Sequence, residues 1–147
     1  MRITHLAFIS LLFIAQSCKK LDETNPEAVV TKYMELRIKQ DFKAAYDLIS
    51  TDSKKFATLN EYTKYFEIPD SVKPQGRLIK SILPVDENIS SPSYKRFKVN
   101  GVQISHDGDS INYLTYFTLK NEDGNWRIVW NSIITQMANL SFNKGDY

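Results

Sequence analysis

Cys18 is the only cysteine of the 147-residue chain, and the segment before it has the order of an export signal. Arg2 supplies a positive start, residues 6–14 are apolar, and Ala15-Gln16-Ser17 lead directly into the cysteine. A lone thiol in an oxidising exported compartment is open to intermolecular pairing, and acylation after cleavage would remove it. The alternative is ordinary signal-peptidase cleavage, because an Ala-x-Ser sequence also suits that enzyme.

The sequence Ala15-Gln16-Ser17-Cys18 resembles a bacterial lipobox, with Ala15 where leucine is usual. The resemblance implies a signal peptide over residues 1–17, a lipid on Cys18, a lipidated tether over residues 18–24 and one domain over residues 25–147. It also implies an outer-membrane lipoprotein of the bacterial cell envelope, on the periplasmic face or at the cell surface. The apolar stretch is shorter than the roughly 20 residues that span a bilayer, so we expect membrane contact through the lipid anchor.

Groups that could act as catalytic bases are scarce after the signal segment. His106 is the only histidine beyond residue 17, and no strand predicted below has an aspartate or glutamate in its interior. Tyr33, Tyr113 and Tyr116 could donate hydrogen bonds, but general acid–base catalysis also needs a positioned base. No serine-centred nucleophile motif occurs. We therefore expect no catalytic residues and no cofactor.

Residues 107–110, Asp-Gly-Asp-Ser, superficially resemble the start of a calcium-binding loop. Their glycine stands in the wrong place, and Thr118 occupies the position where such a loop has its closing glutamate. We expect a hairpin turn there and no metal site.

The charge balance is close to neutral. Loss of residues 1–17 would leave 130 residues with 18 basic and 17 acidic side chains, a net charge of +1, which gives no electrostatic case for nucleic-acid binding. The predicted strands nevertheless carry bases without acids: Arg77, Lys80, Lys95, Arg96, Lys98 and Arg127. These residues form either a solvated outer face that discourages aggregation or a shallow site for an anionic ligand or partner.

The first half of the domain is predicted to be helical. Asn25 and Pro26 are typical of a helix start. The helix that follows has one apolar arc: Val29, Val30, Tyr33, Met34, Leu36 and Ile38. A second helix is predicted from Asp41 to about Ser50, and a third begins with the capping-box pattern of residues 58–61.

The second half is predicted to form four strands, over residues 77–85, 94–105, 111–120 and 126–137. The segments between them are rich in Asn, Asp, Gly and Ser, as hairpin connections usually are. Apolar residues of the second strand change from odd to even positions at Asn100-Gly101, which predicts a β-bulge there. Alternation predicts one inner face for the last two strands: Ile111, Tyr113, Phe117, Leu119, Trp126, Ile128, Trp130 and Ile134.

Helices followed by a curved antiparallel sheet resemble the nuclear-transport-factor-2-like, or cystatin-like, α+β fold. Residues 26–30 and 39–50 are similar to the opening two helices of a family of small bacterial lipoproteins of unknown function, once labelled lumazine-binding. Residues 117–128 are similar to its last hairpin. That family usually has glycine where this chain has Gln40, at the turn between the two helices.

The resemblance implies a cone of sheet whose open end is often a ligand pocket, although a fold alone does not assign a function. The candidate ligand-binding residues are Tyr33, Phe97, Tyr113 and Trp130, which at this spacing are also typical of a core. We expect a non-catalytic, membrane-anchored domain that binds a small molecule or a protein partner. The alternative is a lyase or isomerase acting in the apolar cone, which a buried acid or histidine near Tyr113 would favour.

Overall fold

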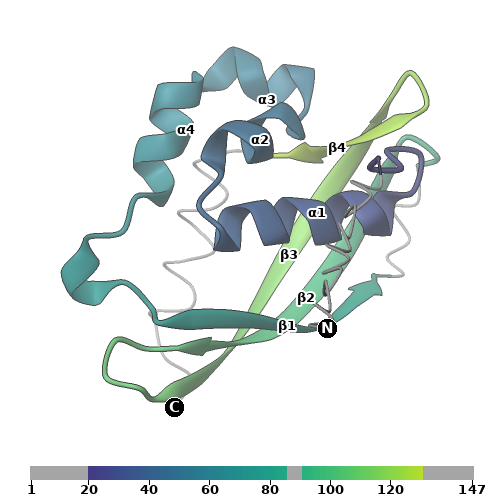
Figure 1. Ribbon diagram of the computed structural model, residues 1–147. Helices are drawn as coiled ribbons and strands as arrows, with labels where there is room; N and C mark the ends of the chain where they lie inside the picture. Colours follow the sequence, from purple (N-terminus) through teal and green to yellow (C-terminus); the bar gives the residue numbers. More distant parts are fainter. Residues whose placement is uncertain (1–19, 86–90, 131–147) are drawn as a thin grey trace, which may run out of the picture.

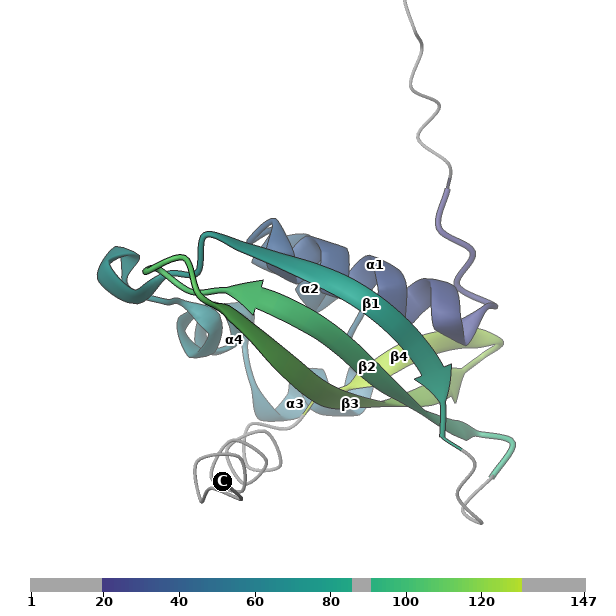
Figure 2. The same cartoon turned by 90° about the horizontal axis from the view of Figure 1, so that it is seen from below.

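Four helices precede a four-stranded antiparallel sheet in the part of the chain that the computed structural model describes, residues 20–85 and 91–130. The helices lie against one face of the sheet, and the sheet curves around them (Figures 1 and 2). The predicted α+β class, N-terminal helices packed on a curved antiparallel sheet, is confirmed. We call the concave side of the sheet the cone.

Helix α1 (Pro26–Ile38) begins where the sequence predicts. The Asn25 side chain accepts hydrogen bonds from the backbone N–H groups of Glu27 and Ala28. Five residues of the predicted apolar arc are buried: Val29, Val30, Tyr33, Met34 and Leu36. The chain leaves the helix through Gln40, whose φ of 61° lies in the left-handed region. This turn therefore uses the conformation that glycine adopts most cheaply.

The second predicted helix ends at Asp47, before the predicted end near Ser50, and a helix that the sequence analysis did not predict follows it. Helix α2 (Phe42–Asp47) stops early, and Ser50 caps a further helix, α3 (Thr51–Phe56). The break arises because Ile49 pairs with Ile128 of the last strand in a parallel bridge. The backbone N–H of Ser50 donates to the Ile128 carbonyl over 2.8 Å, so the sheet takes a hydrogen bond that a continuous helix would have used.

The third predicted helix is α4 (Leu59–Phe66). Its capping box is present, because the Thr58 hydroxyl accepts from the Glu61 N–H and the Glu61 carboxylate accepts from the Thr58 N–H. Tyr62 is fully buried, and the exposed chain after α4 passes through one 3-10 turn, Asp70–Val72.

The strands are β1 (Gly76–Pro84), β2 (Tyr94–Ile104), β3 (Ser110–Glu122) and β4 (Asn125–Val129), in the order β1-β2-β3-β4. They agree with prediction to within two residues, except that β4 ends at Val129 and residues 131–137 lie outside the described residues. Asp123 and Gly124, both with positive φ, form the two-residue turn between β3 and β4.

The irregularity of the sheet lies on a different strand from the one predicted. Strands β2 and β3 pair without a break through Asn100 and Gly101. The shift in register falls instead in β1, between Ile79 and Ser81, so that Lys80 is the extra residue opposite that step.

The change of apolar parity in β2 has another cause. Val102 and Ile104 belong to the outer face, where Ile104 is partly exposed, and they do not continue the inner face of Phe97. Ile111, predicted to lie inside, is 52% exposed, and it is the second residue of β3, next to the hairpin turn.

Part of the predicted tether belongs to the folded domain. Leu21 packs against the core, and the Glu23 carbonyl accepts a hydrogen bond of 2.8 Å from the N–H of Trp126. The Glu23 carboxylate also pairs with Arg127 over 2.6 Å. These contacts hold the segment just before α1 against the core and β4. No helix within the two described ranges combines the length and apolar character needed to cross a membrane.

Candidate functional site

The aromatic residues predicted to bind a ligand face the inside of the fold, where most of them are core residues. Tyr33 and Phe97 are buried, and Trp130 packs edge to face on Tyr62 of α4 with ring centres 5.2 Å apart. The Tyr62 hydroxyl donates to the Tyr33 hydroxyl over 2.7 Å. Packed aromatic side chains therefore fill the middle of the cone, and the hydroxyls of Tyr33 and Tyr62 are hydrogen-bonded to each other.

Tyr113 differs from Tyr33 because its hydroxyl has no hydrogen-bond partner among the described residues. The ring of Tyr113 crosses over Gly101 of the neighbouring strand, and a Cβ on Gly101 would overlap the ring and the hydroxyl. The hydroxyl is buried without a hydrogen bond. Burial raises the pKa of Tyr113, and the positive charges of Arg77 and Arg37 oppose that rise. The neighbours of Tyr113 are thus guanidinium groups, where an enzyme of the alternative class would need an acid or histidine.

Arg37, in the last turn of α1, is a residue that the sequence analysis missed. Its guanidinium carbon lies 3.7 Å from the ring centre of Phe66 and 5.8 Å from that of Tyr33, in cation–π range. The Nε atom of Arg37 is buried and has no hydrogen-bond partner in the part of the chain that the structure describes. The available signal was spacing: Arg37 follows Tyr33 by four residues, which places it on the apolar face of the helix.

Arg77, at the start of β1, brings a second guanidinium to the same end of the cone. Its Nε donates to the Gln103 amide oxygen over 2.8 Å. Burial lowers the pKa of Arg77 and the positive charge of Arg37 lowers it further, whereas Tyr113 opposes the shift. Within residues 20–85 and 91–130, neither arginine forms an ion pair with an acid. We refer to Arg37, Arg77 and Tyr113 as the cone-end cluster.

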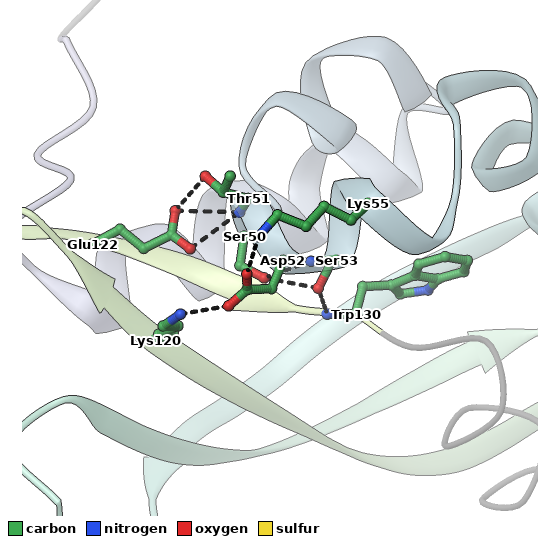
Figure 3. Close-up of polar contacts among 8 residues, drawn as sticks. All are labelled: Ser50, Thr51, Asp52, Ser53, Lys55, Lys120, Glu122 and Trp130. Atoms are coloured by element: carbon green, nitrogen blue, oxygen red, sulfur yellow. Dashed lines mark hydrogen bonds and ion pairs between the residues drawn. The ribbon is translucent and has the colours of Figure 1, made fainter.

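Trp130 stands next to this cluster and is held there by α3. Its backbone N–H donates to the buried Ser53 hydroxyl over 2.9 Å, and the Ser53 and Ser50 hydroxyls lie 2.8 Å apart (Figure 3). The indole packs on Phe66, the ring that also carries Arg37. The indole Nε1 is buried and, like Arg37 Nε and the Tyr113 hydroxyl, has no hydrogen-bond partner among the described residues.

Ion pairs and hydrogen bonds fasten α3 to β3. The Asp52 carboxylate lies 2.5 Å from the Lys120 ammonium and 2.9 Å from that of Lys55 (Figure 3). The Glu122 carboxylate accepts from the backbone N–H and the hydroxyl of Thr51. Because Ser53 of α3 accepts the hydrogen bond from the Trp130 N–H, these contacts also help to fix the position of Trp130.

The cone-end cluster can donate hydrogen bonds and positive charge, but it contains no base. In the described strands, no aspartate, glutamate or histidine lies on the inner face. In the same described part of the chain, no group of three or more His, Cys, Asp or Glu side chains is placed to hold a metal ion. The arrangement is suited to binding an electron-rich group.

The other residues considered from sequence lie elsewhere. His106 and the Asp107–Asp109 segment form the β2–β3 hairpin turn, as predicted, with Gly108 at a φ of 93°. The other strand cations have local contacts. Lys80 donates to Asn112, and Arg127 pairs with Glu23. Lys95 lies over the Trp126 ring and Arg96 over the Tyr116 ring, whereas Lys98 lies on the outer face. Arg77 alone among the strand cations joins the cone-end cluster. Cys18 and Ile134 lie outside the described residues.

Comparison with known proteins finds similarity of fold. No family model and no curated protein matches this sequence. A SEC-C motif containing protein from Rhodopseudomonas palustris matches with a TM-score of 0.52 and 9% identity, over 74% of this chain and 77% of that one. A candidate NTF2-like transpeptidase from Campylobacter jejuni matches with a TM-score of 0.45 and 16% identity, over 73% and 99%. At such identities the likeness concerns the fold alone.

Proposed function

We propose that this chain is a bacterial envelope lipoprotein, anchored through Cys18, whose domain binds a small molecule at the open end of the cone without catalysing a reaction. The observation that carries this proposal is a set of buried donors at that end that find no acceptor within residues 20–85 and 91–130: Arg37 Nε, Tyr113 Oη and Trp130 Nε1. Buried polar groups in folded proteins are nearly always satisfied, so unmatched donors gathered at one place favour a ligand that supplies acceptors.

The position of the segment before α1 supports a binding site on the side of the domain that is remote from the membrane. Glu23 is fixed to β4 next to the start of α1, so a lipid on Cys18 would hold that end near the bilayer. Helix α1 has 13 residues and is therefore about 20 Å long, and Arg37 lies in its last turn. Glu23 and Arg37 thus lie near opposite ends of α1, and a soluble ligand would reach the cluster from the aqueous side.

The anchor is tested by Cys18→Ala in cells. We expect wild-type protein to take up labelled fatty acid and sediment with membranes, because multiple acyl chains give stable attachment. The variant should take up no label and leave the membrane fraction. Persistent labelling of the variant would refute the anchor at this residue.

Binding is tested by ligand-observed NMR of the purified full-length protein with a panel of small organic molecules, followed over hours. Compounds that bind and stay unchanged support the proposed function. Conversion of a bound compound would favour the lyase or isomerase alternative, and loss of conversion in Tyr113→Phe would place that reaction at the cone end. A panel of which no member binds would refute a small-molecule site and leave a protein partner as the surviving interpretation.

A further inference from the structure

We infer that the cone-end cluster binds the oxyanion group, carboxylate or phosphate, of a small organic acid whose apolar body packs on the neighbouring aromatic rings. The inference rests on the proposed function and assigns its ligand class. It concerns Arg37, Arg77 and Tyr113, which come from α1, β1 and β3 and meet only in the folded chain.

The first argument is charge. Arg77 bonds to Gln103, two residues along β2 from Gly101, and the Tyr113 ring crosses Gly101. Arg77 and Tyr113 therefore share the inner face of the sheet, which α1 covers with Arg37 in its last turn. Both guanidinium groups are partly removed from water. Like charges in a partly buried site repel, and each also loses hydration. Within the described residues no acid pairs with either group. An anion between them would offset both costs.

The second argument is hydrogen-bond type. The unmatched atoms of Arg37 and of the adjacent Trp130 can only donate, and the unmatched Tyr113 hydroxyl can donate as well. Carboxylates and ionised phosphates are rich in acceptor sites, and hydrogen bonds from guanidinium to such oxygens are among the strong ones. A ligand made mainly of donors would leave the same atoms unsatisfied.

A simpler explanation covers only part of these observations. Arg37 could lie where it does because cations are stabilised near a helix C-terminus and on the face of Phe66. That account gives no reason for Arg77 to come from a separate strand to the same place. It also gives no reason for Tyr113 to cross Gly101 and end with a buried, unpaired hydroxyl.

The aromatic surroundings suggest the probes. Phe66 and Tyr33 lie beside Arg37, so a benzene ring is a suitable body for a test ligand. Benzoate and phenyl phosphate carry the two oxyanion types, and benzamide is a neutral compound with nearly the shape of benzoate. Calorimetric titration of the full-length protein should show at least one anion binding about tenfold or more tightly than benzamide. The tighter anion identifies the group that the site prefers.

Variants locate the site. Arg37→Gln and Arg77→Gln should each weaken anion binding about tenfold or more, and Tyr113→Phe should weaken it less, because it removes one neutral donor. Arg77→Lys keeps the charge without the planar fork and should give an intermediate loss. Lys98→Gln removes a cation from the opposite face of the sheet and should leave binding unchanged. Circular dichroism and melting curves confirm that each variant is folded.

Several results would overturn the inference. Benzamide binding as tightly as both anions would remove the role of charge, and so would an anion affinity that is the same in wild type, Arg37→Gln and Arg77→Gln. An equal loss in Lys98→Gln would mean nonspecific attraction to a basic surface. If neutral compounds of the NMR panel bind and anions do not, the inference fails while the proposed function stands. If nothing binds, both fail.

Discussion

The Tyr62 hydroxyl donates a hydrogen bond of 2.7 Å to the Tyr33 hydroxyl, and both rings are fully buried between α1, α4 and the sheet. Burial raises the pKa of both phenols, so the pair is neutral in the folded protein. The bond joins α1 to α4. The Arg37 guanidinium lies over the Tyr33 ring, and the Trp130 indole packs on the Tyr62 ring.

Removing one partner of this pair should cost more than removing both. Tyr33→Phe leaves the Tyr62 hydroxyl buried and unmatched, at a cost of about 1–3 kcal/mol in the free energy of unfolding. The double variant Tyr33→Phe/Tyr62→Phe should be more stable than the two single losses predict by addition. Urea unfolding of the four proteins measures this coupling. Strict additivity would show that the hydrogen bond contributes nothing.

Gln40→Gly should stabilise the protein. A residue with a side chain pays about 1–2 kcal/mol to adopt the left-handed conformation seen at Gln40, and glycine avoids most of that at a smaller cost in the unfolded chain. We expect a gain of about 0.5–1 kcal/mol in the free energy of unfolding. Gln40→Ala, which keeps a Cβ, should give no such gain. A loss of stability in Gln40→Gly would mean that the glutamine side chain itself supports the turn.

Trp130→Ala should be far more damaging than Arg127→Ala. The Trp130 indole is buried against Tyr62, Tyr65 and Phe66, so its truncation should cost about 3–5 kcal/mol. Arg127 lies on the other face of β4, and its pair with Glu23 is partly exposed, which limits the loss to about 1 kcal/mol. Denaturant midpoints compare the two variants directly. Equal losses would contradict the inner face described for β4 and the site built on it.

Acid should weaken the attachment of α3 before the carboxyl of Asp52 is half protonated. Hydrogen bonds from Lys120 and then Lys55 hold the pKa of Asp52 at about 2, below its ordinary value of 3.8. Since the folded pKa is depressed, the stabilisation is present above about pH 4 and is lost as the pH falls toward 2. Melting temperatures across this range should fall less steeply for Asp52→Asn. Salt should reduce the difference, because the carboxylate is half exposed.

Local signals were sufficient for most of the fold. Asn25-Pro26, the capping box of Thr58 and Glu61, and the Asp123-Gly124 turn act through neighbouring backbone groups, so each could be recognised from a few adjacent residues. The early end of α2 and the additional helix α3 could not be recognised in this way. They depend on a bridge between Ile49 and Ile128, which are far apart in the sequence.

The candidate site shows the same division between local and long-range causes. The sequence by itself determined which aromatic residues face inward, because alternation along a strand and spacing along a helix follow from backbone geometry. It also placed Tyr113 and Trp130 among the candidates. Only the tertiary structure showed that Arg37 and Arg77 lie near Tyr113. It also showed that Tyr33 and Phe97 are core residues, and that three buried donors have no acceptor among the described residues. Charge repulsion and unsatisfied hydrogen bonds depend on distances in space between different helices and strands. The local sequence pattern of one helix or strand does not determine those distances.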